Sequence, residues 1–408
     1  MLNINELFSN RIGGKEFLNN TNIYRFTKIK NAKEEAINKG YEVLDFGIGE
    51  PDKKANDLII DCLYDEAKKW ENREYADNGC LEFNKACSAY LRVEHGVEVD
   101  YKSEVMHCMG IKAALNILPL AFINKDDYII TTSPGYNVMA NLGKWLDCKV
   151  YEYKLNKFNN YLIDFEDIDE SILKKCKLLY INYPNNPTGA VATREFFKEV
   201  VKYAKKYNFI VVHDAAYIDL CFDESSKVSF LSVEGAKDVG VELYSFSKGF
   251  NMTGWRIGFI AGNKDIIKAY GTIKENVDSG QFLAIQKACI TALNNYELIV
   301  NENKEMYLRR HKLIKDVLEK CGFKASVPKA GFYQYVEIPK SCNGVSFESA
   351  SEFALWLIEN AHVMVIPYDD EGKYVRFSMT FVASNEEQEK EVADKLEERL
   401  KKYKFEYK

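Results

Sequence analysis

Short runs of apolar residues alternate with longer helical patterns through the middle of the chain. Six of these runs, each bounded by turn or polar residues, are predicted strands: EVMHCMG, DYIITTSP, KLLYINYP, FIVVHD, VELYSFSK and RIGFIAG. Helical patterns lie between several of them, including residues 112–122 and 194–207. Nearly continuous apolar strands that alternate with helices predict an α/β fold, in which helices flank both faces of a mainly parallel sheet.

The pattern changes after about residue 278. Long helices are predicted over 280–321, followed by the strand GFYQYVEIP, a helix at 347–361, the strand YVRFSM and a charged helix from about residue 384. This layout is typical of a smaller α+β domain. We therefore expect a large domain over residues 46–294, and a small domain built from residues 1–45 and 295–408. The first 40 or so residues are expected to pack on the small domain or on a partner subunit.

Composition narrows the possible functions. The chain has 408 residues, of which 47% are hydrophobic, and this is enough for more than one domain core. A formal net charge of -6 without a block of like charge argues against nucleic acid as a partner. The chain has neither a signal-peptide pattern nor an apolar run near the ~20 residues of a membrane span, so we expect no membrane association and a cytoplasmic location.

Ten cysteines without C-x-x-C and five histidines without H-x-x-x-H predict free thiols and no metal site.

Polar residues of different chemical types follow four of the predicted strands. Individually each is ordinary, because a single lysine is usually a solvated surface group and NNPTG is usually only a turn. Ligands of parallel α/β sheets bind at the carboxyl ends of the strands, so we expect these residues to gather at one edge. They are Gly110 and Lys112, then Asn186, then Asp214 and Tyr217, then Ser245, Ser247 and Lys248, with Arg256 eight residues further on.

This set supplies what pyridoxal 5'-phosphate requires of a protein, beginning with the ring. Lys248 offers an amine for the aldehyde carbon and is followed by the flexible Gly249. Asp214 ends an apolar strand, where a desolvated carboxylate needs a cationic partner such as a protonated ring nitrogen. Tyr217 and Asn186 carry donors for the phenolic oxygen of the ring.

The phosphate of that cofactor requires backbone N–H groups at a helix N-terminus, together with hydroxyl and cationic donors. The segment GIKAALNIL opens a predicted helix with Gly110 and places Lys112 in its first turn. Ser245, Ser247 and Arg256 are expected to complete this phosphate site.

With these residues in order, the chain resembles the fold-type I, class I/II pyridoxal-phosphate-dependent aminotransferases. The resemblance rests on NYPNNPTGA, HDAAY and SFSKGFNMTGWRIGF, with 28 positions from Asn186 to Asp214 and 34 from Asp214 to Lys248. It extends from FGIGEPD to YVRFSM. Within residues 181–292, the segments GAKDVGVE, NMTGWRIGF and DSGQFLAIQKA are most similar to the LL-diaminopimelate aminotransferase subgroup.

The resemblance implies a role for each matched residue. Lys248 is the implied catalytic Schiff-base lysine, and Tyr136 is implied to stack on the ring. The implied phosphate ligands are Gly110, Ile111 through its backbone N–H, Lys112, Ser245, Ser247 and Arg256. Tyr75 matches a tyrosine that reaches the phosphate of the neighbouring subunit, which implies a homodimer with shared sites. Arg376, with Asn186 and the backbone of Gly49, is implied to hold the substrate α-carboxylate.

The implied reaction moves an amino group from an amino acid, with LL-2,6-diaminopimelate as the best candidate, to a 2-oxo acid such as 2-oxoglutarate by a ping-pong mechanism. The chain departs from the subgroup at Ile111, at Ala113 and in SKGF. Aspartate, alanine, aromatic or basic amino acids therefore stay open as donors. The same fold and cofactor residues also serve β-lyases, decarboxylases and amino acid oxidases.

The sequence lacks the marks of two functions outside this enzyme class. A pyridoxal-phosphate-binding regulator would carry a basic helix-turn-helix segment, and neither end of the chain shows one. A dehydrogenase would need the dinucleotide fingerprint, but GIGEPD lacks its third glycine.

Overall fold

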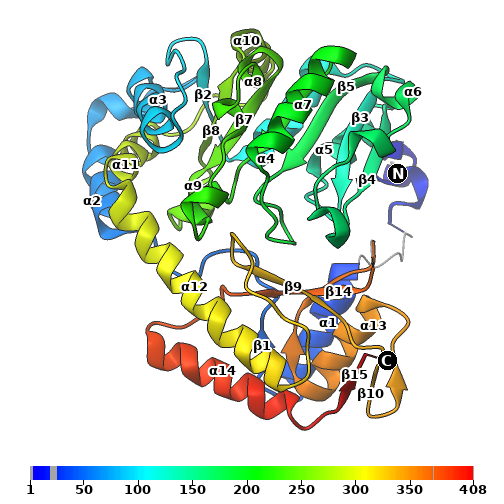
Figure 1. The fold of residues 1–408 in the computed structure, drawn as a ribbon. Coiled ribbons are helices and arrows are strands. Elements are labelled where there is room, and N and C mark those ends of the chain that lie inside the picture. Colours follow the sequence, from blue (N-terminus) through cyan, green and yellow to red (C-terminus); the bar gives the residue numbers. More distant parts are fainter. Residues whose placement is uncertain (1–2, 19–24, 371, 408) are drawn as a thin grey trace.

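A computed structural model of the chain describes residues 3–18, 25–370 and 372–407. A seven-stranded sheet with helices on both sides forms the upper part of the molecule in Figure 1. The strand order in the sheet is β2-β8-β7-β6-β5-β3-β4. These strands are β2 Val105–Cys108, β3 Tyr128–Ser133, β4 Lys149–Lys154, β5 Cys176–Asn182, β6 Ile210–Asp214, β7 Gly240–Ser245 and β8 Gly258–Gly262.

The structure confirms the predicted α/β fold and all six predicted strands of this sheet. Strands β3 to β7 pair in parallel, whereas β8 runs antiparallel to both of its neighbours, β7 and β2. The sheet also contains β4, which was not predicted. Its sequence, KVYEYK, mixes charged and aromatic residues because β4 is the edge strand and is largely half-buried or exposed.

Helices cover both faces of the sheet and bury one hydrophobic cluster on each side. Helix α7 shows how the local sequence produces this packing. The Thr193 hydroxyl caps its first turn, Phe196, Phe197, Val200, Val201 and Ala204 form its buried face, and it ends at the left-handed residue Asn208. The main helices of this part are α2 Asp57–Ala67, α3 Leu81–His95, α4 Ile111–Phe122, α5 Val138–Trp145, α7 Arg194–Tyr207, α10 Lys264–Lys274 and α11 Leu283–Asn294.

The long helix α12 Tyr296–Lys320 leads from this sheet to a smaller group of elements in the lower part of Figure 1. A three-stranded antiparallel sheet forms its centre, with the order β13-β14-β9. The elements are α1 Arg25–Asn38, β1 Leu44–Asp45, β9 Tyr333–Glu337, β10 Ser341–Cys342, β11 Val345–Ser346, α13 Ala350–Trp356, β12 Val363–Met364, β13 Ile366–Tyr368, β14 Tyr374–Ser378, α14 Glu386–Leu400 and β15 Phe405–Glu406.

Helix α1 packs against α13, as expected for the N-terminal segment, although residues 19–24 of that segment lie outside the described residues. The predicted domain division at residues 45/46 and 294/295 stays a prediction. Within the described ranges, no helix is both long and apolar enough to cross a lipid bilayer.

A fully buried arginine, Arg310 of α12, ties the segment before α2 to the small group of elements. Its guanidinium donates to both carboxylate oxygens of Asp52, at 2.9 and 3.0 Å, and its Nε donates to Glu389 of α14 at 2.9 Å. Three carbonyl oxygens of the loop 379–383 accept its remaining hydrogen bonds. This network fixes the position of the segment that carries Gly49.

Candidate active site

A cavity of about 280 Å³ lies at the carboxyl ends of β5, β6 and β7, next to the start of α4 and to β14. It brings together every predicted site residue except Gly110 and Tyr75. Its lining consists of Gly49, Ile111, Lys112, Tyr136, Asn182, Asn186, Asp214, Ala216, Tyr217, Ser245, Ser247, Lys248, Thr253, Arg256, Tyr333 and Arg376.

Lys248 presents its amine to this cavity from the short helix α9 Phe246–Gly249, which directly follows β7. Its Nζ donates a 2.9 Å hydrogen bond to the carbonyl oxygen of Gly49. Burial lowers the pKa of this amine to about 8, and the positive charges of Arg376 and Arg256 act in the same direction against Glu50 and Asp214. Lys248 therefore gives up its proton far more readily than a surface lysine, as a nucleophile or general base requires.

Asp214 is a buried carboxylate at the end of β6. Its Oδ1 accepts the N–H of Ala216, and its Oδ2 accepts the hydroxyl of Tyr180, each at 3.0 Å. Burial raises the pKa of Asp214, while these hydrogen bonds lower it. Both donors are neutral groups, so a cationic ring nitrogen at the cavity would complete the surroundings of this carboxylate.

The start of α4 and Arg256 form a site suited to an anion. Gly110 has a left-handed φ of 73° and precedes α4, and no side chain within the described residues caps the first turn of this helix. A Cβ atom at Gly110 would lie 2.4 Å from Nη2 of Arg256, so only glycine permits this approach of the guanidinium to the helix N-terminus. Ser245 and Ser247 line the same cavity.

Arg376 of β14 is a buried cation whose hydrogen-bond acceptors are neutral. Its Nη1 donates to Oδ1 of Asn186, and its Nη2 donates to the carbonyl oxygen of Gly47, each at 3.1 Å. Its Nε has no partner in the described chain. A buried guanidinium with spare donors at a cavity is suited to a carboxylate ligand.

Asn182 and Tyr333 are cavity residues that the sequence analysis missed, as are Ala216 and Thr253. Asn182 donates to the carbonyl oxygen of Asp214 at 2.9 Å and accepts the N–H of Asn186 at 3.0 Å, so it joins two predicted site residues. The Tyr333 ring lies 4.1 Å from the Arg376 guanidinium, and its hydroxyl contacts that of Tyr217 at 3.2 Å. Asn182 could have been predicted, because it is a polar residue at the end of an apolar strand. Nothing in the local sequence around Tyr333 indicates its contacts.

Tyr75 lies outside this cavity, and its side chain is 84% exposed. In the single chain the phenol of Tyr75 therefore lies in solvent. It could contact a phosphate site only if that site belonged to a second subunit.

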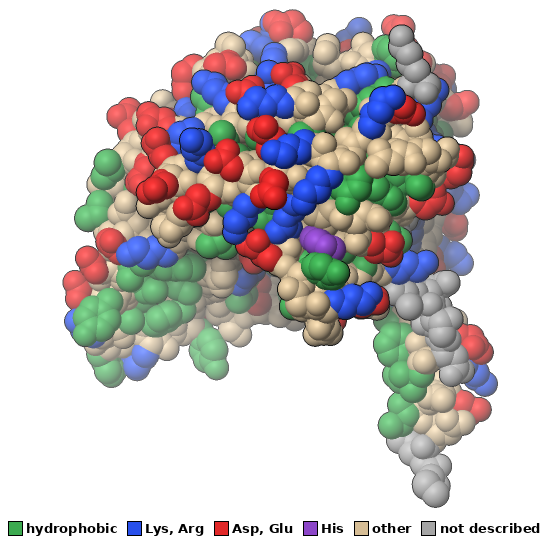
Figure 2. Space-filling model, turned by 90° about the horizontal axis from the view of Figure 1, so that it is seen from below, with side chains coloured by type: hydrophobic (Ala, Val, Ile, Leu, Met, Phe, Trp, Pro, Cys, Tyr) green, Lys and Arg blue, Asp and Glu red, His purple; other side chains and the backbone are tan. Residues whose placement is uncertain are grey.

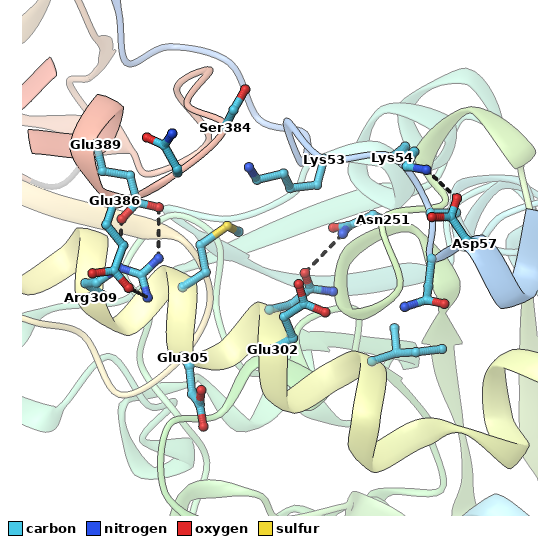
Figure 3. Close-up of a pocket in the computed structure, with 16 residues that line it drawn as sticks. Lys53, Lys54, Asp57, Asn251, Glu302, Glu305, Arg309, Ser384, Glu386 and Glu389 are labelled. Carbon is cyan, nitrogen blue, oxygen red and sulfur yellow. Dashed lines mark hydrogen bonds and ion pairs between the residues drawn. The ribbon is translucent and has the colours of Figure 1, made fainter. Parts of the chain in front are cut away.

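A second cavity of about 520 Å³ lies between α12, the segment 53–57 and the start of α14 (Figure 3). Several of its charged groups neutralise one another. Lys54 pairs with Asp57, and Arg309 pairs with Glu389 at 2.8 Å and with Glu386 at 3.4 Å. Its lining lacks the combination of half-buried amine, buried carboxylate and helix N-terminus that distinguishes the cavity at Lys248.

The sequence profile of the family described as aminotransferase class I and II matches residues 41–396. The chain belongs to this family. Aminotransferases of this family depend on pyridoxal 5'-phosphate, and the chain is accordingly a pyridoxal-phosphate-dependent aminotransferase.

Relatives match along nearly the whole chain. The LL-diaminopimelate aminotransferase of Methanocaldococcus jannaschii is 47% identical over 398 residues, which cover 97% of this chain and 95% of that protein. The LL-diaminopimelate aminotransferase of Methanococcus maripaludis is 41% identical over 411 residues, with 98% of each chain covered. The substrate-bound structure of BacF from Bacillus subtilis has a TM-score of 0.86 and 34% identity, and covers 96% of this chain and 98% of that one.

Proposed function

We propose that this aminotransferase takes the amino group of LL-diaminopimelate and passes it to a 2-oxo acid such as 2-oxoglutarate, in a ping-pong cycle at the cavity around Lys248. The observation that carries this proposal is the meeting of a half-buried amine, a buried carboxylate, an anion site and a buried guanidinium in one cavity. The donor is proposed because the relatives with 47% and 41% identity are LL-diaminopimelate aminotransferases.

The donor set fits pyridoxal 5'-phosphate. In the proposed arrangement Asp214 would pair with the ring nitrogen, Tyr217 and Asn186 would donate to the ring oxygen, and Tyr136 would pack on the ring. Ile111 and Lys112 at the N-terminus of α4, together with Ser245, Ser247 and Arg256, would hold the phosphate. Bound there, the cofactor supplies an aldehyde that bonds the amino nitrogen and a ring that accepts the electron pair of the broken Cα–H bond.

The side chains around the cofactor carry out the remaining tasks. Arg376 binds the α-carboxylate of the amino acid and thereby orients its Cα toward Lys248. The Lys248 amine, with its pKa of about 8, would take the proton from Cα and deliver it to the former aldehyde carbon of the cofactor in the same half-reaction, and would move a proton in the opposite direction in the reverse half. Asp214 stays ionised and holds a proton on the ring nitrogen, which stabilises the developing negative charge.

We also propose a homodimer with shared sites. Large apolar side chains are exposed on and around α2 and its following turn, including Leu58, Tyr64 and Trp70. Figure 2 shows hydrophobic side chains gathered along this edge of the molecule, on the same side as α2 in Figure 1. A contiguous apolar surface of this kind is typical of a subunit interface. Tyr75 follows this surface in the sequence, so dimerisation would carry its phenol toward the partner.

A cytoplasmic location is proposed on the state of the cysteines. All ten are free thiols in the structure and eight of them are buried, which suits a reducing compartment.

Initial rates with a panel of donors test the proposed substrate. The purified enzyme, loaded with pyridoxal 5'-phosphate, is assayed with LL-diaminopimelate, aspartate, alanine, phenylalanine and lysine in the presence of 2-oxoglutarate. A kcat/KM for LL-diaminopimelate at least about tenfold above the others supports the proposal, since this ratio measures discrimination in the transition state. A higher kcat/KM for another donor would show that this other amino acid is the preferred substrate. The chain would still be an aminotransferase.

A further inference from the structure

His213 is a fully buried histidine that the reaction described above does not use. It directly precedes Asp214 in β6, so its side chain points to the opposite face of the sheet. Its Nδ1 lies 2.9 Å from Oε1 of Glu242, and its Nε2 lies 2.9 Å from the carbonyl oxygen of Tyr183. Both ring nitrogens therefore have an oxygen partner inside the protein.

The partners determine where the protons are. The carbonyl oxygen of Tyr183 can only accept a hydrogen bond, so Nε2 of His213 carries a hydrogen. Glu242 accepts further hydrogen bonds from the Ser229 hydroxyl at 2.5 Å and from the N–H groups of Phe230 and Leu231 at 3.2 and 3.1 Å. Each oxygen of Glu242 therefore accepts an N–H group and Oε2 also accepts the hydroxyl, a set of donors suited to an ionised carboxylate. An ionised carboxylate can only accept, so Nδ1 of His213 also carries a hydrogen.

The electrostatics of Glu242 agree with this assignment. Burial alone would raise the pKa of its carboxyl group, but the hydrogen bond from His213, its charge and the Ser229 hydroxyl lower the pKa to about 2. Phe197 and Phe230 pack on the imidazole at ring-centroid distances of 5.0 and 6.3 Å, and this keeps water from the ion pair. Other titratable neighbours are the buried Tyr244 and the half-buried His95, and desolvation lowers the pKa of His95 to about 3.

The ion pair connects three adjacent strand ends that carry the active site. Tyr183 follows β5 and precedes Asn186 by three positions, and His213 precedes Asp214 by one. Glu242 lies in β7, directly opposite His213 in the strand register, and precedes Lys248 by six positions. The positive charge on His213 is also among the effects that lower the pKa of Asp214 against its burial.

We propose that His213 is a buried imidazolium ion that, together with Glu242, positions Asn186, Asp214 and Lys248 and keeps Asp214 ionised. His213 touches neither substrate nor cofactor and is a positioning residue. Its charge state stands on the structure alone, whereas its effect on the cofactor rests on the proposed function.

The charge state is measured directly by nitrogen NMR of protein labelled in its five histidines, without cofactor. The His213→Gln variant assigns the resonances. At about pH 8, where a free imidazole is mostly neutral, we expect both nitrogens of His213 to carry hydrogen. A neutral His213 would overturn the proposal, whatever the outcome of the substrate assays.

The positioning role is measured by cofactor binding and by visible absorption. In His213→Gln, we expect the Kd for pyridoxal 5'-phosphate to rise at least about tenfold, because small displacements of site groups have large effects. The midpoint of the pH-dependent absorption change of the loaded enzyme should move to higher pH, since loss of a buried positive charge favours protonation nearby.

Two further variants separate charge from packing. The double variant His213→Gln with Glu242→Gln removes no net charge, so its absorption midpoint should return toward that of the wild type. Lys227→Met breaks a partly buried ion pair, with Glu94 at 2.6 Å, whose residues do not line the cavity. This control should lose stability but keep the wild-type midpoint and Kd. Equal shifts in Lys227→Met and His213→Gln would contradict the positioning role.

Discussion

The amine of Lys248 donates a 2.9 Å hydrogen bond to the carbonyl oxygen of Gly49, a residue 199 positions earlier in the chain. The contact joins the end of β7 to the segment that Arg310 holds through Asp52. It also holds the half-buried amine near Arg376 and Arg256, where desolvation and positive charge favour its neutral form.

This position has a consequence for the stability of the cofactor-free protein. An unfolded lysine keeps its proton up to pH 10.5, whereas folded Lys248 releases it at about 8. Between these values the unfolded state binds more protons, so the free energy of unfolding should rise with pH by up to about 3 kcal/mol relative to Lys248→Met. Urea unfolding of both proteins across this range measures the difference. A difference that stays constant with pH would contradict the lowered pKa of Lys248.

Arg376 provides a test of substrate binding. Arg376→Lys keeps the charge but loses the planar pair of donors, so we expect kcat/KM to fall at least about tenfold for every α-amino acid donor. Arg194→Lys is the control, because Arg194 is exposed, lies outside the cavity and donates to the carbonyl oxygen of Ser232. The test is steady-state kinetics. The same kcat/KM for Arg376→Lys and the wild type would show that Arg376 does not bind the substrate carboxylate.

Gly110 provides a test of the anion site. In Gly110→Ala the new methyl group would displace Arg256 from the start of α4, and the affinity for pyridoxal 5'-phosphate should fall about tenfold or more. Gly344→Ala is the matched control. Gly344 has a similar left-handed φ of 85°, but a Cβ there meets nothing within 4 Å, so this variant should lose about 1 kcal/mol of stability and keep its cofactor affinity. Equal affinity in both variants, measured by fluorescence titration, would refute the assignment.

The apolar surface around α2 provides a test of the dimer. A double change of Tyr64 and Trp70 to aspartate should convert the protein to a monomer in light scattering, because two charges would have to be buried in the interface. Phe158→Asp is the control, since Phe158 is 90% exposed outside this surface. A double variant that stays dimeric would exclude this surface as the interface.

The shared site can be tested by mixing two defective chains. Tyr75→Phe should weaken cofactor binding, and Lys248→Ala should abolish turnover. If Tyr75 serves the partner, a hybrid dimer of the two variants contains one site with both wild-type residues. Refolding the mixture should therefore restore activity at limiting cofactor, and a mixture no more active than Tyr75→Phe alone would place Tyr75 outside the partner's site.

Much of the site was predictable because its residues follow apolar strands, and parallel strands bring their carboxyl ends to one edge. Asp214 and Lys248 are examples, since each follows a buried strand directly. Tyr180 and Tyr333 were not predictable, because their importance arises from contacts with Asp214 and Tyr217 across the fold. The antiparallel direction of β8 was equally hidden, since a buried strand has the same apolar pattern in either direction.

In the proposed reaction, the cavity around Lys248 stores an amino group between two half-reactions. The most direct measurement mixes the loaded enzyme with LL-diaminopimelate alone, then adds 2-oxoglutarate, and follows the 2-oxo product, glutamate and ammonia. We expect about one 2-oxo product per site in the first step, no ammonia, and glutamate only after 2-oxoglutarate is added. Continuous release of ammonia without an acceptor would contradict the account and identify a lyase or oxidase on this fold.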